Sequence, residues 1–282
     1  MISIASGIAA AAMWAASTIC TSRSSRIIPP IAILGWVLLI GMVISAPFAL
    51  AEGVPVRFST EHAVWLGVTA LGNTTGLLCA YSSLRFGKVG VVAPITSAQG
   101  AAAAAIAVIA GEQLATGAGL ALGVIVLGVA LSSMKAGDEA LEGGRARVAV
   151  SYAIIAALFF GIGLYAMGRL SEDLPVSWII FPSRTLGVLG VTVPLALLGR
   201  LRMTRSAAPF VVASGLLEVG GLVAFTIGAR HGIAVTAILA SQFAAFAAVA
   251  AFLLFRERLA RVQLAGVAVI AVGVAVLTGL QA

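Results

Sequence analysis

The sequence has few charged side chains: Asp, Glu, Lys and Arg together make up only 10% of its 282 residues. A soluble domain carries about 25% of such residues, whereas this chain is 61% hydrophobic. The composition therefore excludes an ordinary soluble domain and is typical of a protein that crosses a membrane several times. The net charge of +7 does not indicate nucleic-acid binding, because the basic residues are spread over short loops instead of forming one patch.

Cysteine and histidine are also scarce, with two residues of each. Cys20 and Cys79 lie in or at the end of apolar segments, so we expect them to be packing residues and not a disulfide or metal pair. His62 and His231 lie at segment ends without the spacing of metal ligands. We expect no metal and no other cofactor.

Motifs of catalysis are missing too: the chain has no GxSxG, no HExxH and no phosphate-cradling glycine loop. We therefore expect no enzyme. Without an ATP-binding motif, energy for any transport would come from a gradient or from the substrate itself.

Long apolar segments dominate the chain. A membrane-spanning helix needs about 20 apolar residues, and charges, prolines and glycines separate ten such segments. We predict spans near residues 3–21, 31–50, 62–84, 89–110, 114–134, 148–168, 176–198, 208–229, 233–255 and 261–280. The predicted fold is an all-α polytopic membrane protein.

The long polar loop at 135–147 divides these spans into two sets of five. We expect a first five-helix repeat at 1–136, a cytoplasmic linker at 137–147 and a second five-helix repeat at 148–282. An odd number of helices in each repeat makes the second copy enter the membrane from the other side. The two halves are therefore expected to be inverted repeats related by a pseudo-two-fold axis in the membrane plane.

An internal repeat supports this division, because residues 70–131 recur without a gap 145 positions later. Asn73 then corresponds to Glu218, and Glu112 to Glu257. Glu112 and Glu257 each precede an expected helix, where a carboxylate is expected to cap the helix N-terminus.

The basic residues also predict orientation. Loops after the odd-numbered spans hold thirteen of the seventeen Lys and Arg residues, and the other loops hold only Arg57, Arg169 and Arg230. By the positive-inside rule the odd loops are cytoplasmic. We expect a multi-pass protein of the bacterial cytoplasmic (inner) membrane with both termini outside.

Two charged residues are expected well inside spans, Glu218 in the eighth and Arg184 in the seventh. A charge at the bilayer centre costs about 2.5–3.5 kcal/mol, so such residues face a cavity or a partner. Their expected depths differ by roughly 5–10 Å, which an arginine side chain can reach. They form either a structural ion pair or a substrate-binding or proton-coupling site.

Asn73 is expected to face Glu218 across the pseudo-axis, where an alternating-access site belongs. Further candidate binding residues are Gln99, Ser241, Gln242, Tyr81 and Trp14. Pro182 is expected to open the backbone of the seventh span near Arg184.

Two segments resemble the EamA repeat of the drug/metabolite transporter superfamily. They are residues 255–277, FRERLARVQLAGVAVIAVGVAVL, and residues 109–114, IAGEQL. The resemblance covers the whole chain and implies a carrier with a central cavity lined by both halves. Members often have a proline after the polar stretch of spans four and nine, where this chain has Gly100 and Phe243.

These features predict a secondary transporter that moves a small polar or amphiphilic metabolite, such as an amino acid, by alternating access, with export as the expected direction. One alternative is an antiporter that exchanges multiple drugs or lipophilic cations for protons at Glu218. A second alternative is a membrane scaffold that transports nothing and has no cavity at mid-depth. The expected partners are a small-molecule substrate, the lipid bilayer and, as coupling ions, protons.

Overall fold

The computed structural model describes residues 1–56, 58–87, 89–113, 117–133 and 144–247, together with residues 262, 265–266, 268–269, 272–273 and 276. Predictions about Glu257, most of the linker and most of the last expected span concern residues outside these ranges.

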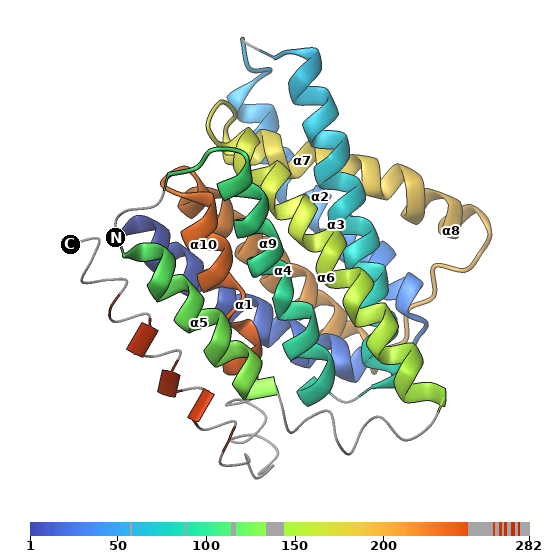
Figure 1. Cartoon of the computed structure of the whole chain (residues 1–282). Helices are drawn as coiled ribbons and strands as arrows, with labels where there is room; N and C mark the ends of the chain where they lie inside the picture. The colour runs from blue at the N-terminus through green and yellow to red at the C-terminus, as the bar shows by residue number, and fades with distance from the viewer. Residues whose placement is uncertain are drawn as a thin grey trace.

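Every secondary-structure element in the described part of the chain is a helix (Figure 1). In chain order the helices are α1 (Ile2–Ser24), α2 (Pro30–Glu52), α3 (Thr60–Phe86), α4 (Val89–Ile109), α5 (Ala118–Ser133), α6 (Gly144–Ser171), α7 (Val176–Gly187), the π-helical turn η1 (Val188–Thr192), α8 (Val193–Leu197), α9 (Ala208–Ala229) and α10 (Ile233–Ala240). Helices suit a membrane because their backbone hydrogen bonds are satisfied within the segment.

Six helical stretches are long and apolar enough to cross a membrane. They are α1, α2, α3, α6 from Arg147, the continuous stretch from α7 to α8, and α9. Shorter apolar helices run over Ile95–Ile109 and Ile233–Ala247. The prediction of an all-helical, multi-pass protein is confirmed, whereas the number of ten spans stays a prediction.

The two halves interlock through matched helix pairs. Helix α1 of the first half packs along α9 of the second, and α3 of the first half packs along α6 of the second. Helices α2 and α7 face each other, as do α4 and α10. Exchange of the first repeat with the second maps this set of contacts onto itself.

The seventh span continues through Pro182, contrary to the predicted opening there. Its irregular part lies further along, where the π-helical turn η1 leads into α8 with Pro194 in its first turn. A proline has no N–H to donate, and its ring clashes with the carbonyl four residues earlier. The wider π turn at Val188–Thr192 accommodates Pro194, so the perturbation falls before that proline.

The expected ninth span is interrupted after Ala240, and the helix resumes at 243–247. Ser241 Oγ donates to the Ile238 carbonyl at 2.6 Å, and Gln242 Nε2 donates to the same carbonyl at 3.1 Å. In a regular α-helix the Gln242 N–H would donate to the Ile238 carbonyl, but here it donates to the Leu239 carbonyl. The two side chains take its place at the Ile238 carbonyl. The interruption therefore needs no proline.

The ends of the helices define two faces. The face that carries Arg23, Arg26, Arg85, Arg200, Arg202 and Arg205 is called the basic face. On the opposite face, Ser3 Oγ donates to the His231 carbonyl at 3.1 Å, and His62 Nε2 lies 3.3 Å from Asp173 Oδ2. The first contact joins the start of α1 to the loop after α9, and the second joins the start of α3 to the loop after α6.

Candidate substrate site

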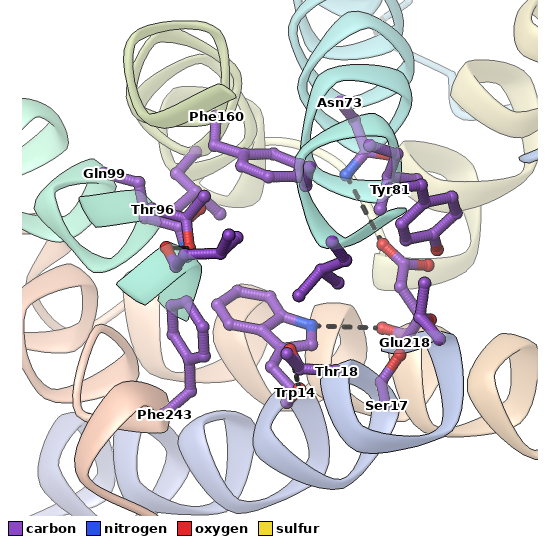
Figure 2. Close-up of a pocket in the computed structure, with 16 residues that line it drawn as sticks. Trp14, Ser17, Thr18, Asn73, Tyr81, Thr96, Gln99, Phe160, Glu218 and Phe243 are labelled. Atoms are coloured by element: carbon purple, nitrogen blue, oxygen red, sulfur yellow. Dashed lines mark hydrogen bonds between the residues drawn. The ribbon is translucent and has the colours of Figure 1, made fainter. Parts of the chain in front are cut away.

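A cavity of about 80 Å³ lies between helices of both halves (Figure 2). It runs from Glu218, halfway along α9, toward the basic face. Its lining comes from α1, α3, α4, α6, α9 and the segment after α10: Trp14, Ser17, Thr18, Thr21, Asn73, Leu77, Ala80, Tyr81, Leu84, Val92, Thr96, Gln99, Phe160, Leu164, Glu218 and Phe243. A water needs about 10–15 Å³ on this measure, so the cavity has room for a few waters in this conformation.

The polar end of the cavity is a network of three side chains. Glu218 forms an ion pair with Arg184 of α7, and both side chains are almost fully buried. Asn73 of α3 joins them, because its Nδ2 donates to Glu218 Oε1 at 3.5 Å and its Oδ1 accepts from Arg184 Nη1 at 3.0 Å. The contacts expected from the repeat and from the charge pattern are both present.

Arg184 reaches this network because α2 leaves room for it. A Cβ at Gly41 would lie 3.0 Å from both Cδ and Nε of Arg184. A side chain at that position would press on the Arg184 side chain, so glycine gives it the room to pass between α2 and α9. Arg184 itself is 2% exposed and does not line the cavity.

The charges at this end compensate each other. One guanidinium lies beside one carboxylate, so the network carries no net charge while both groups are ionised. Desolvation of two ions is costly, and good geometry with additional hydrogen bonds offsets part of that cost. Asn73 supplies those bonds from the other half of the molecule.

Hydroxyl groups line the cavity toward the basic face. Ser17 Oγ lies 2.9 Å from Ser214 Oγ, and Thr21 Oγ1 lies 2.7 Å from the same atom. Trp14 Nε1 donates to the Glu218 backbone carbonyl at 3.3 Å. One side of α1 is thereby joined to α9, and three hydroxyl-bearing residues of this helix, Ser17, Thr18 and Thr21, line the cavity.

Two aromatic side chains form opposite walls, each seated on a glycine of the other half. Trp14 of α1 lies against Gly221 of α9, and Phe160 of α6 lies against Gly76 of α3. Gly76 and Gly221 occupy equivalent repeat positions. The indole of Trp14 also stacks on Phe225, with ring centroids 6.2 Å apart.

Five predicted site residues line the cavity, namely Glu218, Asn73, Gln99, Tyr81 and Trp14. Three others do not: Arg184 lies behind Glu218, and Ser241 and Gln242 are buried at the α10 interruption. The interruption gives those two a structural role. Their assignment to substrate binding stays a prediction, as it does for the residues that line the cavity.

Sequence reasoning missed Ser17, Thr18, Thr21 and Phe160. The hydroxyls resemble ordinary small residues of a span, since a Thr such as Thr18 also bonds to its own helix, here to the Trp14 carbonyl at 2.8 Å. The repeat contained a signal for Phe160, because Gly76 and Gly221 are aligned and both accept an aromatic ring.

No group of three or more His, Cys, Asp or Glu side chains suited to a metal ion occurs among the residues that the structure describes. The arrangement at Glu218 can bind or orient a small molecule through hydrogen bonds and aromatic contacts. It offers no nucleophile with an adjacent base.

Comparison with known proteins agrees with this arrangement. None of the curated proteins matches the sequence. Several solved structures are similar; one of them, a crystal structure, has a TM-score of 0.73 and 18% identity over 99% of this chain and 96% of the other. At that identity the likeness shows the fold alone. The sequence profile of the EamA-like transporter family matches residues 1–134 and again residues 147–279. The chain therefore belongs to the EamA-like transporter family and has the fold of its membrane transporters.

Proposed function

We propose that this protein exports a small amphiphilic metabolite, with a neutral amino acid as the first candidate, by alternating access between its two halves. The observation that carries the proposal is the cavity at mid-depth whose polar end is the Glu218, Asn73 and Arg184 network. Both halves contribute to that network, as a site between two repeats requires.

The chemistry of the lining favours a substrate with one polar and one apolar part. Glu218 and Asn73 offer hydrogen-bonding groups at one end, while the rings of Trp14, Phe160 and Phe243 line the walls. Because Arg184 offsets the charge of Glu218, the polar end suits a neutral or zwitterionic group better than a lone cation.

Two features taken together support export. The cavity extends toward the basic face, where Thr21, Leu84 and Val92 line it near the helix ends. By the positive-inside rule that face is cytoplasmic. A substrate would then enter the cavity from the cytoplasm. The membrane in question is the bacterial cytoplasmic membrane, with ten spans in two inverted repeats and both termini outside.

A second candidate is an antiporter of lipophilic cations driven by protons. One observation favours it, since Glu218 lines the cavity while its partner Arg184 does not. A cation would then displace the guanidinium from the carboxylate. A scaffold without transport is disfavoured, because it leaves no reason for a cavity at the two central polar residues.

Transport into and out of proteoliposomes tests the proposal. The substrate panel contains labelled leucine, phenylalanine and alanine beside tetraphenylphosphonium, each with and without an imposed pH gradient. The variants are Glu218→Gln and, as matched control, Glu61→Gln, which changes an exposed carboxylate distant from the cavity.

We expect a neutral amino acid to move and Glu218→Gln to abolish its transport, while Glu61→Gln behaves as wild type. Loss of pH dependence alone in Glu218→Gln would identify that carboxylate as the proton-coupling group. Movement of tetraphenylphosphonium only, driven by the pH gradient, would replace the first candidate by the second.

A further inference from the structure

A second and larger cavity, of about 560 Å³, lies on the opposite face. The ends of α4, α6 and α9 and the beginning of α10 surround it. Its lining is Ala107, Ala110, Gly111, Glu112, Gln113, Tyr165, Arg169, Glu172, Ala229, Arg230, His231, Gly232, Ile233 and Val235. Both acidic and basic side chains line this second cavity, whereas the cavity at Glu218 is mainly apolar apart from its polar end.

A layer of small and apolar residues separates the two cavities. On α4 the lining of the first cavity ends at Gln99 and that of the second begins at Ala107. Eight residues of helix correspond to a layer roughly 12 Å thick. Ala103 and Ala104 of α4 and Ala237 of α10 are buried in it. A substrate that passes from the first cavity to the second must cross this layer, which α4 and α10 help to form.

One side chain of the first half caps the beginning of α10. Residue 232, which precedes the helix, is a glycine with φ of +142° and has no side chain with which to cap it. The carboxylate of Glu112, in the turn after α4, accepts from Ala234 N–H through both oxygens, at 3.1 and 3.2 Å. Glu112 therefore caps α10, whereas its predicted cap of the next helix concerns a segment that includes residues 114–116, outside the described ranges.

The same end of α10 is tightly packed. A Cβ at Gly168 of α6 would lie 2.7 Å from Ile233 Cγ1, so α6 and α10 approach closely at that point. The N-terminus of a helix has unpaired N–H groups and a partial positive charge, and a carboxylate satisfies both. Release of Glu112 would leave those groups to water and loosen the closed end.

We propose that Glu112 is a positioning residue for transport: by capping α10 from the other half, it holds the route to the opposite face closed. The inference rests on the proposed alternating-access function. It concerns a residue that touches neither the cavity at Glu218 nor the substrate expected there.

The direction of the pH effect follows from the surroundings of Glu112. Burial raises the pKa of its carboxyl above the ordinary value of 4.5; the N–H groups of Ala234 and Ile233 oppose the rise, and the Glu172 carboxylate adds to it. Arg169, paired with Glu172 at 3.4 Å, and then Arg230 and His231 are the other charged or titratable groups around the cavity.

In an open state water would reach Glu112, and its pKa would return toward the ordinary value. The closed state therefore binds the proton more tightly than the open state. Acidification favours closure, and closure weakens as the pH rises through the raised pKa. A glutamine at this position imitates the protonated acid, because its amide oxygen can still accept from Ala234 N–H.

Thiol labelling of the purified protein tests this without any substrate. Cys20 and Cys79 are replaced by serine and alanine, and Ala104→Cys reports on the layer between the cavities. Its rate is divided by that of Gln113→Cys in the opposite-face cavity, which removes the intrinsic pH dependence of the thiol. Leu84→Cys, in the cavity that extends toward the basic face, reports on the reverse change.

We expect labelling at residue 104 to rise and labelling at residue 84 to fall as the pH is raised from 5 to 8. Glu112→Gln should keep residue 104 protected at every pH. Glu112→Ala, which removes the cap, should raise its labelling about fivefold with no pH dependence. Glu172→Gln, a carboxylate of the same cavity, should preserve the pH response and move its midpoint down.

Equal labelling in wild type, Glu112→Gln and Glu112→Ala would overturn the proposal, and so would a rise at residue 104 on acidification. A general loss of folding in Glu112→Ala would raise labelling at residues 84 and 104 together, whereas opening moves them in opposite directions. In that case the proposal is tested only by comparing the pH dependence of labelling in wild type and in Glu112→Gln. Failure of the transport panel would leave this result unchanged, so the two proposals fail separately.

Discussion

Removal of one charge from the buried pair is the sharpest test of how the centre of this protein is held together. In Arg184→Gln the carboxylate of Glu218 stays buried without its counter-ion, and Asn73 Nδ2, at 3.5 Å, is its only remaining side-chain donor in the network. Such a change costs about 3–5 kcal/mol of unfolding free energy. Glu218→Gln leaves the guanidinium unpaired and should cost a similar amount.

The double variant Arg184→Gln with Glu218→Gln should cost less than either single change, because no uncompensated charge is left. A double-mutant cycle, measured by unfolding in mixed micelles, should return a coupling energy of at least about 3 kcal/mol, because the two single costs together exceed the cost of the double variant by more than one single cost. The exposed pair Arg169 and Glu172, 3.4 Å apart, is the matched control and should give about 1 kcal/mol or less.

Additive costs in the cycle would refute this reasoning. They would mean that Arg184 and Glu218 are each satisfied by other groups, and that the neutral polar end described here does not exist. The stability measurement needs no substrate and is therefore independent of what the protein transports.

Three further predictions concern other parts of the chain. Gly221→Ala should reduce stability and transport because its methyl group would overlap the Trp14 indole, while Gly67→Ala, with open space around it, should be neutral or stabilise by up to about 1 kcal/mol in the same unfolding assay. Arg26→Cys in the cysteine-free protein should react with an impermeant maleimide only after cells are opened, and reaction in intact cells would contradict the proposed orientation. Because burial raises the pKa of Glu112, wild type should lose stability relative to Glu112→Gln as the pH rises from 4 to 7, and parallel melting curves across that range would contradict it.

The centre of the site could be predicted because two independent physical rules point to it. The internal repeat places Asn73 and Glu218 at equivalent positions, which meet across a pseudo-two-fold axis. The cost of a buried charge requires a partner for Glu218, and Arg184 was the basic residue at a similar depth. Both rules use only residue types and their positions in the sequence, so they can be applied without coordinates.

The remainder depends on interactions that no single residue reveals. The interruption at Ser241 arises from two side chains that compete for one carbonyl, and from Gly100, whose Cβ would overlap the Ala237 carbonyl. Pro182 lies inside the regular helix α7, whereas the helical turn before Pro194 is a π turn. The hydrogen-bond partner of Glu112, Ala234, lies 122 residues away. The rule that a carboxylate caps the helix following it in the sequence cannot predict such a distant partner.

That last contact also orders the assembly of the protein in time. Glu112 leaves the ribosome 122 residues before Ala234, so the acceptor is already in the membrane when the helix that needs it emerges. The second half made alone would expose unpaired N–H groups at the start of α10 and would lose the α1 and α3 partners of α9 and α6. The second half therefore depends on the first for the cap of α10 and for the helices that pack against α6 and α9.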